Sequence, residues 1–145
     1  MDMVFYRPGH EFAMLDDALN AGGIAWWQME LPAGTVIYSL GKTTMLGYSK
    51  ADTGKFVHYT DFTKRLHPDD YEATMQAMRN HLEGKAPRYE TQYRIRRKDN
   101  SYAVYYDRGK IIGRSGDDIA VAGIVLDVTA NTRFEVAEGK PVRML

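Results

Sequence analysis

An alternation of hydrophobic and polar residues from Tyr89 to Gly109 constrains the fold more than any other feature of the sequence. In the first half of this segment every second residue is Tyr, Thr or Ile, and the residues between them are Glu, Gln or Arg. A period of two is typical of a β-strand with one buried face. Asp99-Asn100 can form a turn, because both residue types tolerate a positive φ, and a second aromatic strand follows. The segment therefore predicts a β-hairpin.

The length of the turn decides which side chains of this hairpin face the protein interior. With a two-residue loop, Ile95 lies opposite Val104 and Tyr93 lies opposite Tyr106. These four side chains would form one apolar, largely aromatic inner face. Such a face is typical of a sheet that lines a pocket or a partner interface, and it does not resemble a catalytic centre.

The composition fits one domain without covalent cross-links. A chain of 145 residues can form a single hydrophobic core. Its 19 Lys and Arg residues balance its 19 Asp and Glu residues, so no net charge attracts nucleic acid or a membrane. The absence of Cys excludes disulfides, thiolate metal sites and a flavin held by a cysteinyl adduct. No apolar run approaches the ~20 residues of a membrane span and no signal peptide is evident, so a cytoplasmic protein without membrane insertion is expected.

Hydrophobic spacing and turn residues predict the other elements. The segment His67–Asp70 opens the longest helix, because proline suits the first helical position and carboxylates there favour the helix dipole. Thr129 can cap a terminal helix that Gly139 and Pro141 end early. The predicted order is a helix at 10–21, strands at 24–31 and 35–39, short helical turns at 43–46 and from 49, a long helix at 67–83, strands at 89–96, 101–113 and 119–128, and the terminal helix. This order requires an antiparallel sheet with helices on one face, an α+β architecture.

Seven short pieces of the sequence occur in the order and spacing found in PAS sensor domains whose second half is the PAC motif. They are Gly23–Trp27, Leu46–Tyr48, Leu66–Asp70, Tyr93–Asp99, Ser101-Tyr102, Asp107–Gly109 and Gly123–Thr129. Over roughly residues 18–130 the chain resembles this family. The resemblance implies a five-stranded antiparallel sheet with helices packed on one face, preceded here by an amphipathic helix. The expected divisions are a leader and flanking helix at 1–21, the PAS/PAC domain at 22–130 and an exit segment at 131–145.

The resemblance also implies a function, a non-enzymatic input module for signal transduction. Such modules act upstream of an effector such as a histidine kinase or a diguanylate cyclase, in the same chain or in a partner. They bind a small ligand, mediate dimerisation, or do both. A ligand-free protein-interaction module is the alternative.

The long helix and the inner face of the sheet supply the candidate ligand pocket. Its expected lining combines apolar, polarizable side chains with phenol hydroxyl groups that can orient a ligand. The candidates are Trp27, Met75, Met78, Tyr93, Val104 and Tyr106. A small metabolite, a non-covalently held flavin or another planar ligand would suit such a lining. The alternative is that these side chains only fill the core.

His81 flanks the apolar stripe of the long helix, three residues after Met78. Haem-binding PAS sensors carry their proximal histidine on the corresponding helix, so the resemblance implies that His81 could be an axial haem ligand. A partly exposed histidine near a helix end can instead act only through the helix dipole. Both interpretations remain open from the sequence.

Two charged clusters are assigned no chemistry. His67 with Asp69 or Asp70 would suit a small cone-shaped α+β enzyme if a buried pair converged, but helix-start chemistry explains the cluster better, and a metal needs three or four convergent ligands. Arg94 and Arg96 alternate with inward residues and are expected on the solvated face of the sheet. Neither a metal site nor a nucleic-acid partner is therefore predicted.

The two ends of the domain are expected to carry the signal. Phe12, Leu15 and Leu19 would cover the sheet or pair with a second copy of the chain, which predicts a homodimer. By resemblance, Asp127 and Thr129 join the last strand to the exit segment, where Asp127 could pair with an arginine of the sheet and Thr129 could cap a helix. A ligand would act by binding one conformational state better than the other.

Overall fold

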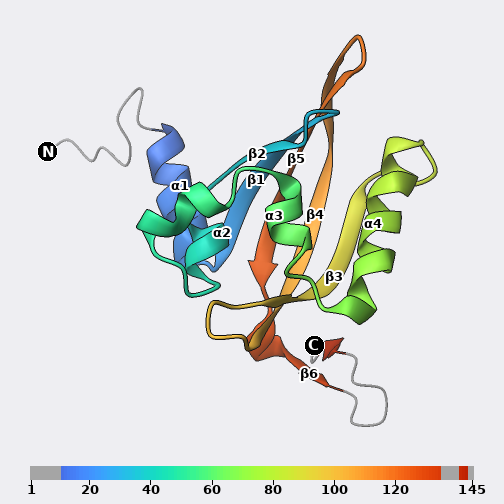
Figure 1. The fold of residues 1–145 in the computed structure, drawn as a ribbon. Coiled ribbons are helices and arrows are strands. Elements are labelled where there is room, and N and C mark those ends of the chain that lie inside the picture. Colours follow the sequence, from blue (N-terminus) through green and yellow to red (C-terminus); the bar gives the residue numbers. More distant parts are fainter. Residues whose placement is uncertain (1–10, 135–140, 144–145) are drawn as a thin grey trace, which may run out of the picture.

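Five strands form an antiparallel sheet at the centre of the molecule (Figure 1). They are β1 (Ile24–Leu31), β2 (Thr35–Tyr38), β3 (Tyr89–Arg96), β4 (Tyr102–Ser115) and β5 (Asp118–Asp127). Their order across the sheet is β2-β1-β5-β4-β3. The computed structural model describes residues 11–134 and 141–143. The expected five-stranded α+β architecture is confirmed.

The chain between β2 and β3 folds into short helices and one long helix that cover one face of the sheet (Figure 1). These are α2 (Gly41–Thr44), the 3₁₀ helix η1 (Lys50–Lys55), α3 (Tyr59–Thr63) and α4 (Pro68–Leu82). The predicted start of the long helix is confirmed, since Pro68 is its first residue and the His67 ring accepts a hydrogen bond from the Asp69 N–H. In the part of the chain that the structure describes, no helix combines the length and apolar character needed to cross a membrane.

Helix α1 (Glu11–Ala21) precedes the sheet and contacts Trp26 of β1 through Phe12 and Asp16. The Phe12 ring meets the Trp26 ring edge-on at a centroid distance of 5.5 Å, and Trp26 Nε1 donates a hydrogen bond to Asp16 at 2.9 Å. No residue of α1 is buried. The expected N-terminal helix is therefore present, and most of its surface lies open to solvent.

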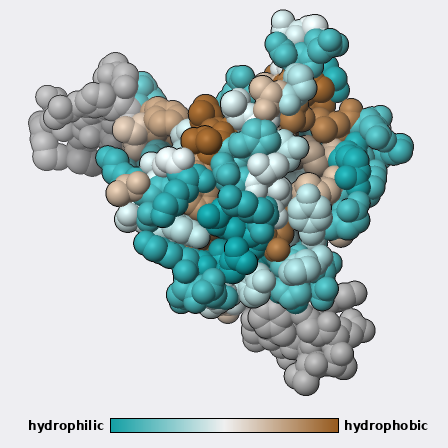
Figure 2. Space-filling model, in the orientation of Figure 1, coloured by the Kyte–Doolittle hydropathy of each residue, from teal (hydrophilic) through white to brown (hydrophobic). Residues whose placement is uncertain are grey.

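The core lies between the sheet and the helices that follow β2. Strand β1 shows how the sequence builds it, because Ala25, Trp27 and Met29 are buried while the residues between them are not. The opposite face of the sheet is less covered, and Ile37 and Ile112 are each 59% exposed. Figure 2 shows hydrophobic side chains at the surface over β2 and along the β4–β5 hairpin, within an otherwise mostly hydrophilic face.

The β3–β4 hairpin is present, but its predicted register is wrong by one residue. Tyr93 lies opposite Tyr105, and Ile95 lies opposite Ala103. The loop has three residues between the paired Arg97 and Ser101, and Asn100 adopts a φ of 71°. A three-residue loop that ends in a left-handed residue is a common hairpin connection. The extra residue turns every side chain of β4 to the opposite face from the one predicted.

Strand β3 is an edge strand whose free side is closed by the chain around the start of α4. The N–H of His67 donates to the carbonyl of Arg94, and the N–H of Arg96 donates to the carbonyl of Arg65, both at 2.9 Å. Asp70 accepts hydrogen bonds from Nε, Nη2 and the backbone N–H of Arg94 at 2.8–2.9 Å. The prediction that Arg94 lies on the solvated face is wrong, since only 5% of the residue is exposed. Closing this edge protects it from pairing with other chains.

The predicted terminal helix is absent from the described residues. After β5 the chain forms only the 3₁₀ turn η2 (Thr129–Asn131), and β6 (Thr132–Phe134) then pairs antiparallel with β7 (Pro141–Arg143). The hydroxyl of Thr129 accepts a hydrogen bond from the Val104 N–H at 2.9 Å and donates to Asp127 at 2.5 Å. It therefore binds the sheet and does not cap a helix. Gly139, expected to help end that helix, lies outside the described residues.

Candidate functional site

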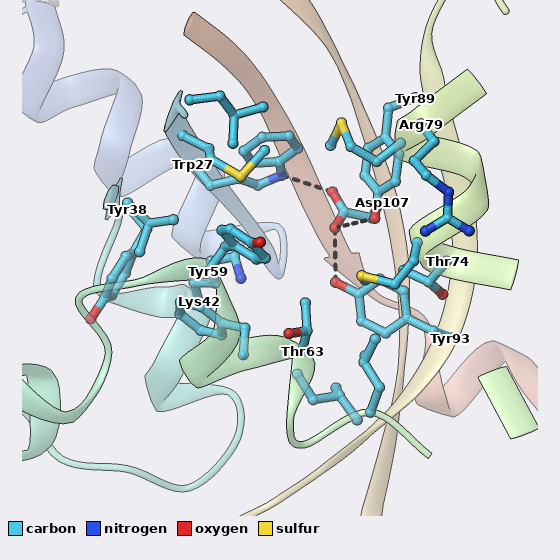
Figure 3. A pocket seen from close by; sticks show the side chains of 18 of the residues that line it. Trp27, Tyr38, Lys42, Tyr59, Thr63, Thr74, Arg79, Tyr89, Tyr93 and Asp107 are labelled. Carbon is cyan, nitrogen blue, oxygen red and sulfur yellow. Dashed lines mark hydrogen bonds between the residues drawn. The ribbon is translucent and has the colours of Figure 1, made fainter. Parts of the chain in front are cut away.

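A cavity of about 260 Å³ lies between the inner face of the sheet and the helices. Most of its wall is apolar, and α4 and the sheet contribute the largest part (Figure 3). Four of the predicted pocket residues line it: Trp27, Met75, Met78 and Tyr93. Further apolar walls come from Met29, Leu66, Leu82 and Ile95.

Val104 and Tyr106 do not line this cavity, so their assignment to the pocket is wrong. The one-residue change in register turns both side chains to the outer face of β4. Val104 is fully buried there, beside the exit segment, and its N–H binds Thr129. Tyr106 lies opposite Gln92, and its hydroxyl binds the Glu90 carboxylate.

The same register brings Asp107 into the cavity. Its carboxylate accepts hydrogen bonds from Trp27 Nε1 at 2.7 Å, from the Tyr93 hydroxyl at 2.8 Å and from the Tyr89 hydroxyl at 3.5 Å (Figure 3). Burial raises the pKa of Asp107, while the charge of Lys42 and these three hydrogen bonds act in the opposite direction. Burial, together with the negative charge of Asp107, also raises the pKa of both phenols. Asp107 thus fixes the orientation of the three aromatic residues that form one end of the cavity.

Lys42 on α2 reaches the cavity from the side of the short helices (Figure 3). The residue is only 7% exposed, and its Nζ lies 3.3 Å from the centroid of the Phe62 ring. Burial lowers the pKa of the ammonium group from 10.5 to about 8, and the charge of Asp107 opposes this change. No described residue accepts a hydrogen bond from Nζ, and Asp107 lies beyond the 4.0 Å of a direct ion pair. The cavity therefore contains a buried cation and a buried carboxylate that do not touch.

Sequence reasoning missed both of these charged residues. Asp107 belongs to a segment that resembles the PAS family, but the incorrect register placed it on the outer face. Lys42 lies in the polar stretch Gly41–Thr44, where a four-residue helix offers no hydrophobic period from which burial could be predicted. In the sequence, only its two-residue spacing from Tyr105 indicates that Asp107 shares a face of the sheet with that residue. Which face this is follows only from the correct turn length.

His81 is buried but does not line the cavity. Its Nδ1 lies 3.0 Å from the carbonyl of Ala86, and its Nε2 accepts a hydrogen bond from the Ile111 N–H at 2.9 Å. Both ring nitrogens therefore bind the backbone, and His81 joins the end of α4 to β4. An axial haem ligand needs a nitrogen directed at the iron, so this geometry contradicts that role. The alternative of a partly exposed helix-end histidine is also wrong.

The residues of the enzyme alternative do not converge. His67 is the N-cap of α4, the Asp69 side chain is 70% exposed, and Asp70 binds Arg94. The Nδ1 of His67 and the nearest Asp69 oxygen are 4.0 Å apart. Within residues 11–134 and 141–143, no group of three or more His, Cys, Asp or Glu side chains could hold a metal ion. The buried catalytic pair that this alternative predicts is not formed.

The predicted relay residues connect the end of β5 to the hairpin. Asp127 accepts hydrogen bonds from the N–H of Thr129 at 3.0 Å and from its hydroxyl at 2.5 Å. Arg97 Nη2 lies 3.5 Å from the same hydroxyl. Asp127 thus binds Thr129, whereas an arginine was the partner expected.

The predicted dimer contact lies on α1. Phe12 is 66% exposed and Leu15 is 56% exposed, while Leu19 is half-buried. The Phe12 ring is held against Trp26 of β1, and Leu15 lies at the open surface.

The fold and the site define an α+β domain with a ligand-sized cavity between an antiparallel sheet and the helices on one of its faces. The family model described as "PAS fold" matches residues 38–125, more than half of the chain. The chain therefore belongs to the PAS fold family, as the sequence pieces implied. Among curated proteins, no sequence matches the chain.

Solved structures of sensory proteins have a similar fold. A sensory box histidine kinase/response regulator from Burkholderia thailandensis E264 has a TM-score of 0.63 and 22% identity, over 80% of this chain and 85% of that chain. The N-terminal domain of a diguanylate cyclase with PAS/PAC sensor from Marinobacter aquaeolei has a TM-score of 0.63 and 18% identity, over 74% and 96%. A domain of a putative light and redox sensing histidine kinase from Haloarcula marismortui has a TM-score of 0.61 and 19% identity, over 81% and 99%.

Proposed function

We propose that this chain is a sensory input module that binds a small molecule in the cavity between the sheet and α4. The observation that carries the proposal is the cavity itself, about 260 Å³ with an apolar wall and two buried charged groups. Burying polar groups lowers stability unless they are well paired. A core that only held the fold together would therefore favour apolar residues in place of Lys42 and Asp107. Membership of the PAS fold family and the sensory proteins with similar folds support the same role.

The cavity volume favours a small metabolite over a large cofactor. Because a cavity of about 150 Å³ holds benzene, about 260 Å³ holds roughly ten non-hydrogen atoms by proportion. A haem or a flavin is several times larger than this volume. The backbone contacts of both His81 ring nitrogens also remove this residue as an axial haem ligand.

The proposed signal passes from the cavity to the exit segment through β4. Asp107 faces the cavity, and three residues earlier Val104 donates its N–H to Thr129. A ligand that binds one position of β4 better than another would therefore also bias the contact between Thr129 and Asp127. The proposed effector is a histidine kinase or a diguanylate cyclase, in the same chain or a partner.

A second proposed role is dimerisation through α1, where Phe12, Leu15 and Leu19 lie. The exposed apolar side chains of Phe12 and Leu15 favour it. Dimerisation and ligand binding use different faces of the sheet, so one does not exclude the other.

Mass spectrometry of the denatured protein and ligand-induced shifts in melting temperature test the binding role. We expect a bound or added small molecule to raise the melting temperature of the wild type, and Met78→Trp, which fills the cavity, to abolish this effect. Met14→Trp on α1 is the matched control, since Met14 lies 38% exposed outside the cavity. If the denatured sample releases no small molecule, and if neither variant changes the shift in melting temperature on addition of a small molecule, the ligand-free interaction module is favoured.

A further inference from the structure

Two cationic side chains reach the cavity, and among the described residues only one of them makes a direct ion pair. Arg79 binds Glu72 at 2.6 Å and Gln76 at 2.8 Å, both through exposed hydrogen bonds within α4. Lys42 is 93% buried, and no described residue accepts a hydrogen bond from its ammonium group. An ammonium group has three donors, and leaving them without acceptors inside a protein is unfavourable.

The neighbours of Lys42 cannot supply this acceptor. Phe62 offers a ring face to the ammonium group, which is a cation–π contact and engages only one side of it. Asp107 lies too far away for an ion pair, and three other donors already bind its carboxylate. The acceptor therefore has to come from a molecule in the cavity, either water or a ligand that displaces it.

We propose that the ligand is a small monocarboxylate whose carboxylate binds Lys42 and whose apolar part lies against Met75, Met78 and Leu66. Tyr59 and Thr63 of α3 lie on the same side of the cavity as Lys42 and offer hydroxyl groups to the second carboxylate oxygen (Figure 3). This inference rests on the proposed binding function and names its ligand class.

A single negative charge fits the cavity better than a phosphate. A phosphate monoester carries about two negative charges near pH 7, whereas the cavity holds one cation that makes no direct ion pair and also the carboxylate of Asp107, whose charge would repel a second negative charge. The apolar wall suits a hydrocarbon chain or an aromatic ring. With room for roughly ten non-hydrogen atoms, octanoate is a probe of suitable size.

Calorimetric titration with octanoate and with the neutral, equally shaped octanamide tests the proposal. The wild type is expected to bind octanoate about tenfold or more tightly than octanamide, the effect of one charge-assisted hydrogen bond. Lys42→Met is expected to bind both probes with similar, weak affinity. Lys110→Met is the matched control, because Lys110 is exposed on the outer face of the sheet, and it should retain the preference of the wild type.

Each other outcome contradicts a defined part of the proposal. Equal binding of the two probes to the wild type, or unchanged octanoate binding by Lys42→Met, would overturn the carboxylate assignment and leave the cavity as a binding site. Binding of neither probe, with release on denaturation of a molecule that lacks a carboxylate, would do the same. Binding of neither probe together with an empty denatured extract would overturn the binding function as well. Circular dichroism of Lys42→Met establishes that the variant is folded.

Discussion

At the scale of single residues, the site is marked by polar groups of buried residues that find no hydrogen-bond partner among the described residues. Lys42 is a buried residue whose ammonium group donates to no described residue, and Thr74 on α4 has a fully buried hydroxyl without a hydrogen-bond partner. Both residues line the cavity, on opposite sides in Figure 3. Unsatisfied groups lower the stability of the ligand-free protein, so their concentration at one cavity is expected of a site that a ligand completes.

Replacing Lys42 by Met is expected to stabilise the ligand-free protein at pH 7, by up to roughly 3 kcal/mol, the equivalent of a pKa lowered from 10.5 to about 8. Between pH 8 and 10.5 the unfolded chain holds the proton that the folded chain has released. The stability of the wild type therefore rises relative to Lys42→Met across this window, and the difference between them narrows. Urea unfolding at pH 7 and pH 9.5 measures this difference in the free energy of unfolding, with Lys110→Met as control. A less stable Lys42→Met at pH 7 would show that Phe62 and Asp107 outweigh the effect of burial.

The unpartnered hydroxyl of Thr74 gives a second prediction. Thr74→Val replaces this hydroxyl by a methyl group of similar size and is expected to stabilise the protein by about 1 kcal/mol. Thr43→Val is the matched control, because Thr43 is also buried in a helix but its hydroxyl donates to the Leu40 carbonyl. That variant should lose about 1 kcal/mol. Chemical denaturation of both variants distinguishes them, and equal losses would contradict the idea that Thr74 is unsatisfied.

At the scale of elements, the contact between α4 and β3 holds the cavity wall in place. Asp70 binds the guanidinium and the backbone N–H of Arg94, and His81 joins the other end of α4 to β4. Met75 and Met78 lie between these two attachments. The helix therefore has fixed ends and flexible side chains on its inner face, which allows the wall to adapt to a ligand while the helix stays docked.

Removal of the Asp70 carboxylate tests this attachment. Asp70→Ala is expected to destabilise the protein by roughly 3 kcal/mol, because it takes the anion away from a buried guanidinium. Asp69→Ala is the adjacent control, and its exposed side chain should contribute less than about 1 kcal/mol. Thermal unfolding of the two variants gives the comparison. Similar small losses in both would mean that α4 is held mainly by its apolar contacts.

The elements also show how far the sequence determines this fold. The alternation in β1 and the Pro68 start of α4 depend on local patterns, and the structure has both as predicted. The inner face of β4 depends on one extra loop residue and on Asn100 at positive φ, which the alternation alone does not encode. For that reason Trp27 and Tyr93 could be placed at the cavity, whereas Asp107 could not. Lys42 could not be placed either, because only tertiary packing of a short helix buries it.

At the scale of the whole molecule, the two faces of the sheet have different surroundings. The helices that follow β2 and the cavity occupy one face, and α1 and the exit segment contact the other. On this second face Trp26 lies opposite Ile124 and Gln28 lies opposite Ile37, and both isoleucines are partly or largely exposed. Together with the apolar residues of α1 they form a hydrophobic surface that a second copy of the chain could cover.

Leu15 allows the proposed dimer to be tested without disturbing the packing of α1, since its side chain is 56% exposed and the Phe12 ring makes the contact with Trp26. Leu15→Glu is expected to weaken dimerisation about tenfold or more, because it would bury a charge in an apolar contact. Ile112→Glu on the β4–β5 hairpin is the control, as Ile112 is 59% exposed outside the proposed contact. Sedimentation velocity over a wide concentration range measures the effect. A wild type that stays monomeric throughout would remove the dimer, and signalling would then have to pass through β4 and Thr129 within one copy of the chain.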